Sequence, residues 1–150
     1  MPVELHSRVR SNAVNAAALR RAAQRLLEAI GEGDAVLSIS LVGDAAIRRL
    51  NREYRGRDRA TDVLSFPLDG ARRRKRARAP RMLGDVVISV PAVRRQAAEY
   101  DATPQREAER LLIHGLLHLL GHDHHVLVER TRMEREERRL ARVIGMPWPY

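Results

Sequence analysis

Four of the six histidines in the sequence stand between residues 114 and 124. His114 and His118 are four residues apart, and side chains at this spacing lie on one face of a helix, about 5–6 Å apart at Cβ. The leucines around them predict a buried helix, which we expect Gly121 to end, since glycine readily takes the left-handed conformation of a helix C-terminus. His124 follows this turn. Three protein nitrogens and one open position are typical of a catalytic zinc, so we predict one Zn²⁺ per chain at His114, His118 and His124.

The third ligand of this zinc site has two alternatives. His122 and His125 flank His124 in the sequence, and either could take its place. Asp123 is interpreted either as a carboxylate that orients an imidazole or as a turn residue.

The histidine spacing resembles the metzincin protease signature H-E-x-x-H-x-x-G-x-x-H. Gly115 stands where these proteases carry their general-base glutamate. The sequence thus keeps the metal-binding pattern and lacks the protease's base, which argues against peptide hydrolysis. A metalloprotease-like hydrolase remains an alternative that a casein assay would distinguish.

The composition predicts one globular domain over residues 1–150. Hydrophobic residues make up 44% of the chain and charged residues 31%, as in ordinary folded domains. No run approaches the ~20 apolar residues of a membrane span, and residues 1–10 show no secretory signal. The absence of cysteine excludes disulfides and thiolate metal sites, and fits a cytoplasmic location.

The net charge of +9 favours a polyanionic partner, most simply nucleic acid. Aromatic residues are only 3% of the chain, which weighs against a surface built from base-stacking rings. The densest charge is at Arg72–Arg78, where six of seven residues are basic. We interpret this run as a loop that holds nucleic-acid phosphates, or alternatively as an ordinary solvated loop.

Strands and helices alternate without strict regularity, which predicts an α/β (α+β) fold with a small mixed sheet covered by helices. Ser11 or Asn12 is the expected cap of the first helix, and Asp44 that of the second. A polar loop over residues 51–62 precedes the third strand, and such loops often carry function. The expected strands are 3–6, 35–42, 63–68 and 82–90, and the expected helices 12–30, 44–54, 91–100, 103 into the histidine stretch, and 126–144.

Three stretches of the sequence carry a more specific pattern. They are His114–His124, then Leu50-Asn51 with Tyr54-Arg55, Asp58 and Thr61–Pro67, and finally Leu83–Ser89. Together they resemble the hallmarks of the YbeY family of rRNA-maturation endoribonucleases, whose metal signature is H-G-x-L-H-L-x-G-Y-D-H. The similarity spans roughly residues 36–150. His122 departs from the signature's tyrosine, and the basic run at Arg72–Arg78 is longer than the family's pattern.

The resemblance implies a zincin-like metal helix that binds zinc through His114, His118 and His124. It also implies a single-strand-specific endoribonuclease acting in maturation of the 16S rRNA 3′ end and in ribosome quality control. The partner would be RNA of the small ribosomal subunit, with no DNA expected. Arg55 would act beside His114 in catalysis, as the cation that stabilises phosphoryl charge; from the residues alone it is one of several arginines on a solvated loop.

The residues leave the chemical route open. They identify no general base, so attack by a ribose 2′-OH and attack by a metal-activated water both remain. A non-catalytic RNA-binding ribosome assembly factor is a second alternative; its structural metal would need four protein ligands, including His122, His125 or Asp123. A monomer is the default expectation.

Overall fold

The computed structural model describes residues 3–68, 81–122 and 126–148. The predicted basic loop at Arg72–Arg78 lies outside the described residues, as do Asp123, His124 and His125. The described part of the chain contains four strands and five helices. They are β1 (Val3–Ser7), α1 (Ala16–Ala29), β2 (Val36–Val42), α2 (Asp44–Arg55), β3 (Val63–Pro67), β4 (Met82–Ser89), α3 (Val90–Glu99), α4 (Pro104–Leu119) and α5 (Leu127–Val143).

The strands form one mixed sheet in the order β1-β2-β4-β3. β1 and β4 both run parallel to β2, whereas β3 pairs antiparallel with β4. Within this sheet β3 is an edge strand, and Pro67 ends it at a place where a missing N–H is tolerated. The predicted α/β fold with a small mixed sheet is therefore confirmed.

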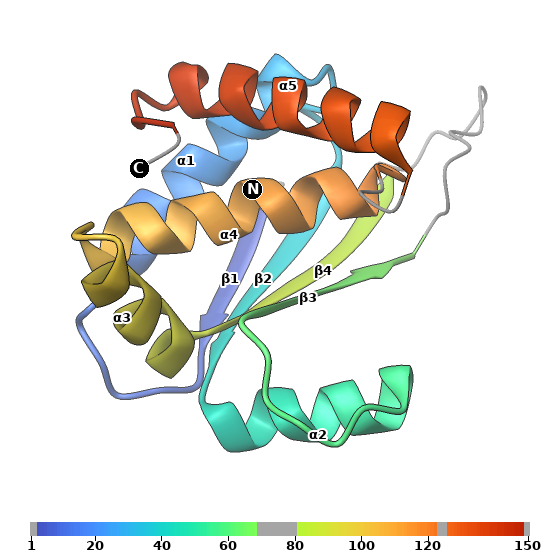
Figure 1. Cartoon of the computed structure of the whole chain (residues 1–150). Helices are drawn as coiled ribbons and strands as arrows, with labels where there is room; N and C mark the ends of the chain where they lie inside the picture. The colour runs from blue at the N-terminus through green and yellow to red at the C-terminus, as the bar shows by residue number, and fades with distance from the viewer. Residues whose placement is uncertain (1–2, 69–80, 123–125, 149–150) are drawn as a thin grey trace.

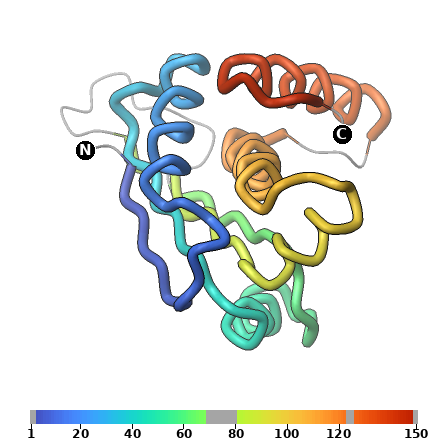
Figure 2. The backbone as a smooth tube through the Cα atoms, turned by 90° about the vertical axis from the view of Figure 1, so that its left-hand side faces the viewer, coloured from blue at the N-terminus to red at the C-terminus, as the bar shows by residue number. Residues whose placement is uncertain are grey.

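Helices cover both faces of the sheet (Figure 1). On one face α1 and α4 lie against the strands and α5 packs over these two helices, while α2 lies on the opposite face (Figure 2). Period-two alternation in β2 sends Leu37, Ile39 and Leu41 into the main core under α1 and α4. Val87 of β4 faces the smaller cluster under α2. No helix in the described part of the chain is long and apolar enough to cross a membrane.

Two predicted helix caps are wrong. Helix α1 begins later than expected because Asn15, rather than Ser11 or Asn12, accepts a hydrogen bond from the backbone N–H of Ala18 at 2.9 Å. Helix α2 is preceded by Gly43 and has no side-chain cap. Asp44 is the first helical residue, and its carboxylate instead accepts hydrogen bonds from other elements, namely from Ser89 and Arg95.

Candidate active site

Helix α4 is buried nearly all round, and its C-terminal end is fixed by a local hydrogen-bond motif. The N–H of Gly121 donates to the carbonyl of His118 and the N–H of His122 to that of Leu117, each at 3.0 Å. Gly121 has a φ of 92°. This is the Schellman arrangement, so the predicted glycine stop is confirmed and the last turn of α4 is held in one geometry.

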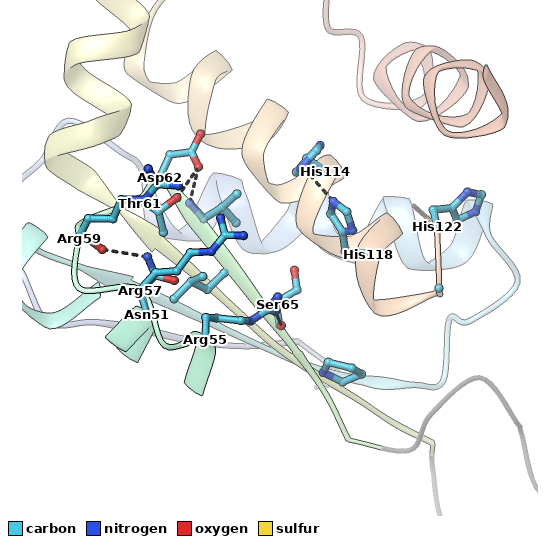
Figure 3. A pocket seen from close by; sticks show the side chains of 14 residues that line it. Asn51, Arg55, Arg57, Arg59, Thr61, Asp62, Ser65, His114, His118 and His122 are labelled. Carbon is cyan, nitrogen blue, oxygen red and sulfur yellow. Dashed lines mark hydrogen bonds between the residues drawn. The ribbon is translucent and has the colours of Figure 1, made fainter. Parts of the chain in front are cut away.

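His114 and His118 are the partly exposed positions in the C-terminal half of this helix, among buried neighbours. Their Nε2 atoms lie 3.1 Å apart, and the rings meet edge to face with centroids 4.5 Å apart. Figure 3 shows the two imidazoles side by side on α4. Two nitrogens bound to one tetrahedral zinc at about 2.0–2.1 Å would be about 3.3 Å apart. The pair therefore fits two positions of a zinc coordination sphere.

His122, the described alternative for the third ligand, lies beyond the helix end. No group of three His, Cys, Asp or Glu side chains within residues 3–68, 81–122 and 126–148 could hold a metal ion, so His122 does not complete a set with His114 and His118. It lines the same cleft as these two histidines and also lies near Glu136. The pKa of that carboxyl is lowered, first by a hydrogen bond from Arg139 and to a smaller degree by His122.

Gly115 has no room for a side chain. A Cβ at this position would lie 2.8 Å from Cγ1 of Val86 and 3.3 Å from Cγ2 of Val63. The Ser65 hydroxyl would be 3.1 Å away, and it donates a 2.8 Å hydrogen bond to the Gly115 carbonyl. At Gly115, where the protease carries its general base, α4 is in close contact with the sheet, so a glutamate there would force α4 or its neighbours to shift.

Arg55 is the last residue of α2, on the other side of the edge strand. Its Nη2 donates a 2.7 Å hydrogen bond to the backbone carbonyl of Ser65, and its guanidinium lies 5.9 Å from the centroid of the Phe66 ring. The side chain therefore reaches from α2 to β3 (Figure 3). Arg55 lines the same cleft as His114 and His118, so the structure brings these three predicted site residues together.

The cleft is open, has a volume of about 660 Å³ and is positively charged. Arg55, Arg57 and Arg59 line it, and none of them forms an ion pair with a carboxylate of the described residues. The carboxylate in its described lining is Asp62, which accepts hydrogen bonds from the N–H of Val63 and from Gln96. The electrostatic field in the cleft therefore favours an anion.

The arginine loop after α2 is fixed by Asn51, a buried side chain to which we assigned no role from the sequence. Its side-chain Nδ2 donates to the backbone carbonyl of Arg59 at 2.9 Å, and its backbone carbonyl accepts from the N–H of Arg57 at 3.2 Å. Asp58 in the same loop pairs with Arg48 at 2.9 Å, and this hydrogen bond lowers the pKa of the Asp58 carboxyl. A polar residue that caps a loop from inside the core gives no periodic signal, so it is hard to identify from sequence.

Glu137 is a second residue missed by the sequence interpretation. It lies on α5, is 9% exposed, and has its Oε2 4.0 Å from Nδ1 of His114. Its helical spacing could have indicated that it is buried. Glu137 stands four residues after Met133 and three before Leu140, within the apolar stripe of α5. A carboxylate on the buried face of a helix requires a partner.

Comparison with known proteins gives a consistent result. A family model described as "Endoribonuclease YbeY" matches residues 4–145. Proteins named "Endoribonuclease YbeY" from an Anaeromyxobacter strain, Myxococcus xanthus and Pelotomaculum thermopropionicum are 48%, 54% and 50% identical to the chain over 128, 110 and 120 residues. These alignments cover 85%, 73% and 79% of this chain, and 64%, 37% and 79% of the respective relatives. The chain thus spans less than two thirds of the first two relatives.

A solved structure is also similar. The solution structure of TM1509 from Thermotoga maritima matches with a TM-score of 0.65 and 26% sequence identity. The match covers 95% of this chain and 88% of that one. The similarity therefore extends over nearly the whole fold and is not confined to the histidine helix.

Proposed function

Because the chain belongs to the YbeY family of endoribonucleases, we propose that it is a zinc-dependent endoribonuclease that cleaves single-stranded RNA. Its proposed role is maturation of the 16S rRNA 3′ end and ribosome quality control. The observation that carries the proposal is the convergence of His114 and His118 in one cleft with the cation Arg55. The Nε2 separation of 3.1 Å supports a shared ion.

The proposed ligands of this ion are His114, His118 and His124. When bound, a zinc ion supplies a Lewis acid that polarises a phosphoryl oxygen and lowers the pKa of a water molecule. The chain's own contribution is to hold two of the imidazoles on one rigid, buried helix whose last turn is locked by Gly121. Rigid placement of ligands avoids a reorganisation cost during the reaction.

Arg55 supplies the second part of the proposed chemistry. Phosphodiester cleavage places additional negative charge on the phosphoryl oxygens, and a fixed guanidinium stabilises that charge. Its planar fork can donate to two phosphoryl oxygens at once. The hydrogen bond to the Ser65 carbonyl holds the guanidinium at the cleft before RNA arrives.

Arg57 and Arg59 are proposed to bind phosphates of the RNA backbone next to the cleaved bond. They lie on the same loop as one another and line the cleft without a carboxylate partner among the described residues. A positively charged groove that follows the phosphates is a common way to bind single strands.

The test is cleavage of a labelled RNA that carries the 16S 3′ end with its precursor extension. The purified protein is analysed for metal and compared with His114→Ala and with Arg49→Ala, an exposed arginine of α2 that does not line the cleft. We expect cleavage by the native chain and by Arg49→Ala, none by His114→Ala, and much slower cleavage of the same RNA annealed to its complement. Cleavage that His114→Ala retains in full would overturn the proposed site.

A further inference from the structure

Three glutamates are buried in the described part of the chain, and their partners differ. Glu107 is 0% exposed, Glu109 7% and Glu137 9%. Arg110 lies 2.6 Å from Glu107, and Arg106 lies 2.9 Å from Glu109. Each of these two carboxylates therefore has a permanent cation one helical turn away.

Glu137 has no such arginine among the described residues. The polar group that it faces there is Nδ1 of His114, at 4.0 Å, and this contact joins α5 to α4. A buried carboxylate without a partner is strongly unfavourable. The position of Glu137 in the apolar stripe of α5 is therefore explained by the imidazole that it faces.

We propose that Glu137 is a positioning residue for the metal site: its carboxylate holds the proton of His114 on Nδ1, so that Nε2 presents a lone pair. This inference rests on the proposed metal site. Ligating histidines commonly donate their second ring N–H to a carboxylate, which fixes the tautomer and the ring orientation. The 4.0 Å separation is longer than a hydrogen bond, so in this structure the carboxylate acts on the Nδ1–H by its charge; such contacts are often long in sites without their ligand.

The contact between the two histidines agrees with this assignment. If Nδ1 of His114 carries the proton, Nε2 of His114 is an acceptor, and the 3.1 Å contact requires His118 to donate from its own Nε2. The proposed role of Glu137 therefore predicts that His118 is the donor in that contact in the metal-free protein. The same protonation pattern leaves the Nε2 lone pair of His114 directed towards the ion.

The experiment compares Glu137→Gln with Glu109→Gln, a matched change at a buried glutamate that pairs with an arginine instead of a histidine. The first measurement is zinc affinity by competition with a chromogenic chelator. We expect Glu137→Gln to lose about 10–100-fold, as outer-shell partners of ligating histidines typically do, and Glu109→Gln to change less than about twofold. Equal affinities of Glu137→Gln and the native chain would overturn the proposal.

The second measurement reports the tautomer directly. In the metal-free native protein, ¹H–¹⁵N NMR of the imidazoles should show His114 protonated on Nδ1; in Glu137→Gln the proton should be shared with Nε2. An unchanged His114 tautomer would overturn the proposal, even if the variant were less stable. If Glu137→Gln does not fold, Glu137→Asp, which withdraws the carboxylate by one methylene, should bind zinc more weakly and must do so for the proposal to stand.

The two readouts separate this proposal from the proposed function. A native chain that bound no zinc would contradict the metal site, while the tautomer of His114 in the metal-free protein would still decide the role of Glu137.

Discussion

The backbone carbonyl of Ser65 accepts a 2.7 Å hydrogen bond from Nη2 of Arg55. The hydroxyl of the same serine donates a 2.8 Å hydrogen bond to the backbone carbonyl of Gly115, which follows His114 in α4. One buried residue of the edge strand therefore connects the cation from α2 to the histidine helix. Ser65 thus links the position of Arg55 to that of the histidine helix through the sheet.

Arg55→Ala should keep the fold and the metal but slow RNA cleavage by about 10²–10³, the effect of removing one donor that stabilises transition-state charge. Arg55→Lys should restore little, because a point charge does not reproduce the planar fork. The measurement is the single-turnover rate at saturating RNA, with Arg49→Ala as the control on the same helix. An unchanged rate in Arg55→Ala would return Arg55 to the role of a solvated arginine.

Gly115→Ala should destabilise the protein by about 1–3 kcal/mol, the usual effect of adding a methyl group to a filled interior. The new Cβ would meet Val86 at 2.8 Å and the Ser65 hydroxyl at 3.1 Å. This loss should exceed the gain in helix propensity, which is at most about 1 kcal/mol. Urea unfolding measures the change. Gly33→Ala is the control, because the Cβ there meets a flexible side chain, Glu28, at 3.3 Å; a larger effect at Gly33 would contradict the packing argument.

Alanine substitution of His114 or His118 should remove most of the bound zinc, because each leaves too few ligands for a stable site. His124→Ala should do the same if it is the third ligand. His122→Ala and His125→Ala should keep their metal. Elemental analysis of each purified variant checks these outcomes, and loss of zinc from His122→Ala together with its retention in His124→Ala would assign the third position to His122.

The sequence was sufficient for the elements and for the placement of His114 and His118 on one helix face, because both depend on local periodicity. Apolar spacing located the helices to within a few residues, and the four-residue spacing of His114 and His118 placed them on one face. Helix caps were less predictable: Asp44 has a suitable side chain, but its carboxylate accepts hydrogen bonds from Ser89 and Arg95 of other elements. Competition from tertiary partners is not visible in a local pattern.

The parts of the site that were missed all depend on contacts between distant segments. Ser65 and Gly115 are 50 residues apart, and Glu137 faces His114 from a different helix. Their roles require the packing of α4 against both β3 and α5. The role of the basic run at Arg72–Arg78 and the ligand role of His124 lie outside the described residues and stay predictions.

Loop anchoring by Asp58 should depend on pH in the acid range. The hydrogen bond from Arg48 lowers the pKa of the Asp58 carboxyl in the folded protein. Its stabilising contribution is thus complete above the unfolded-state value of about 3.9 and is lost as the pH falls through the lower folded-state value. Asp58→Asn should therefore be less stable than the native chain near pH 7, with a difference that disappears in strong acid and shrinks at high salt. Thermal unfolding from pH 2 to pH 7 measures this difference, and Asp34→Asn, at an exposed position without an ion pair among the described residues, should show none.

Arg57 and Arg59 should affect RNA binding without affecting the chemical step. If each neutralises one phosphate of a single strand, the double change Arg57→Ser with Arg59→Ser should make the slope of log affinity against log salt shallower by about 1.4, at about 0.7 per phosphate. KM should rise while the rate at saturating RNA stays nearly constant, because binding that is equal in the ground state and the transition state does not change kcat.

The control for this double variant is Arg20→Ser with Arg21→Ser, an equal loss of charge on α1 at exposed positions that do not line the cleft. It should leave the salt slope and KM close to those of the native chain. An equal flattening of the slope in both double variants would mean that net charge, and not the cleft, attracts the RNA. A change confined to KM in the Arg57 and Arg59 double variant would assign these two arginines to binding of neighbouring phosphates. The rate loss expected for Arg55→Ala would assign Arg55 to the reacting phosphate.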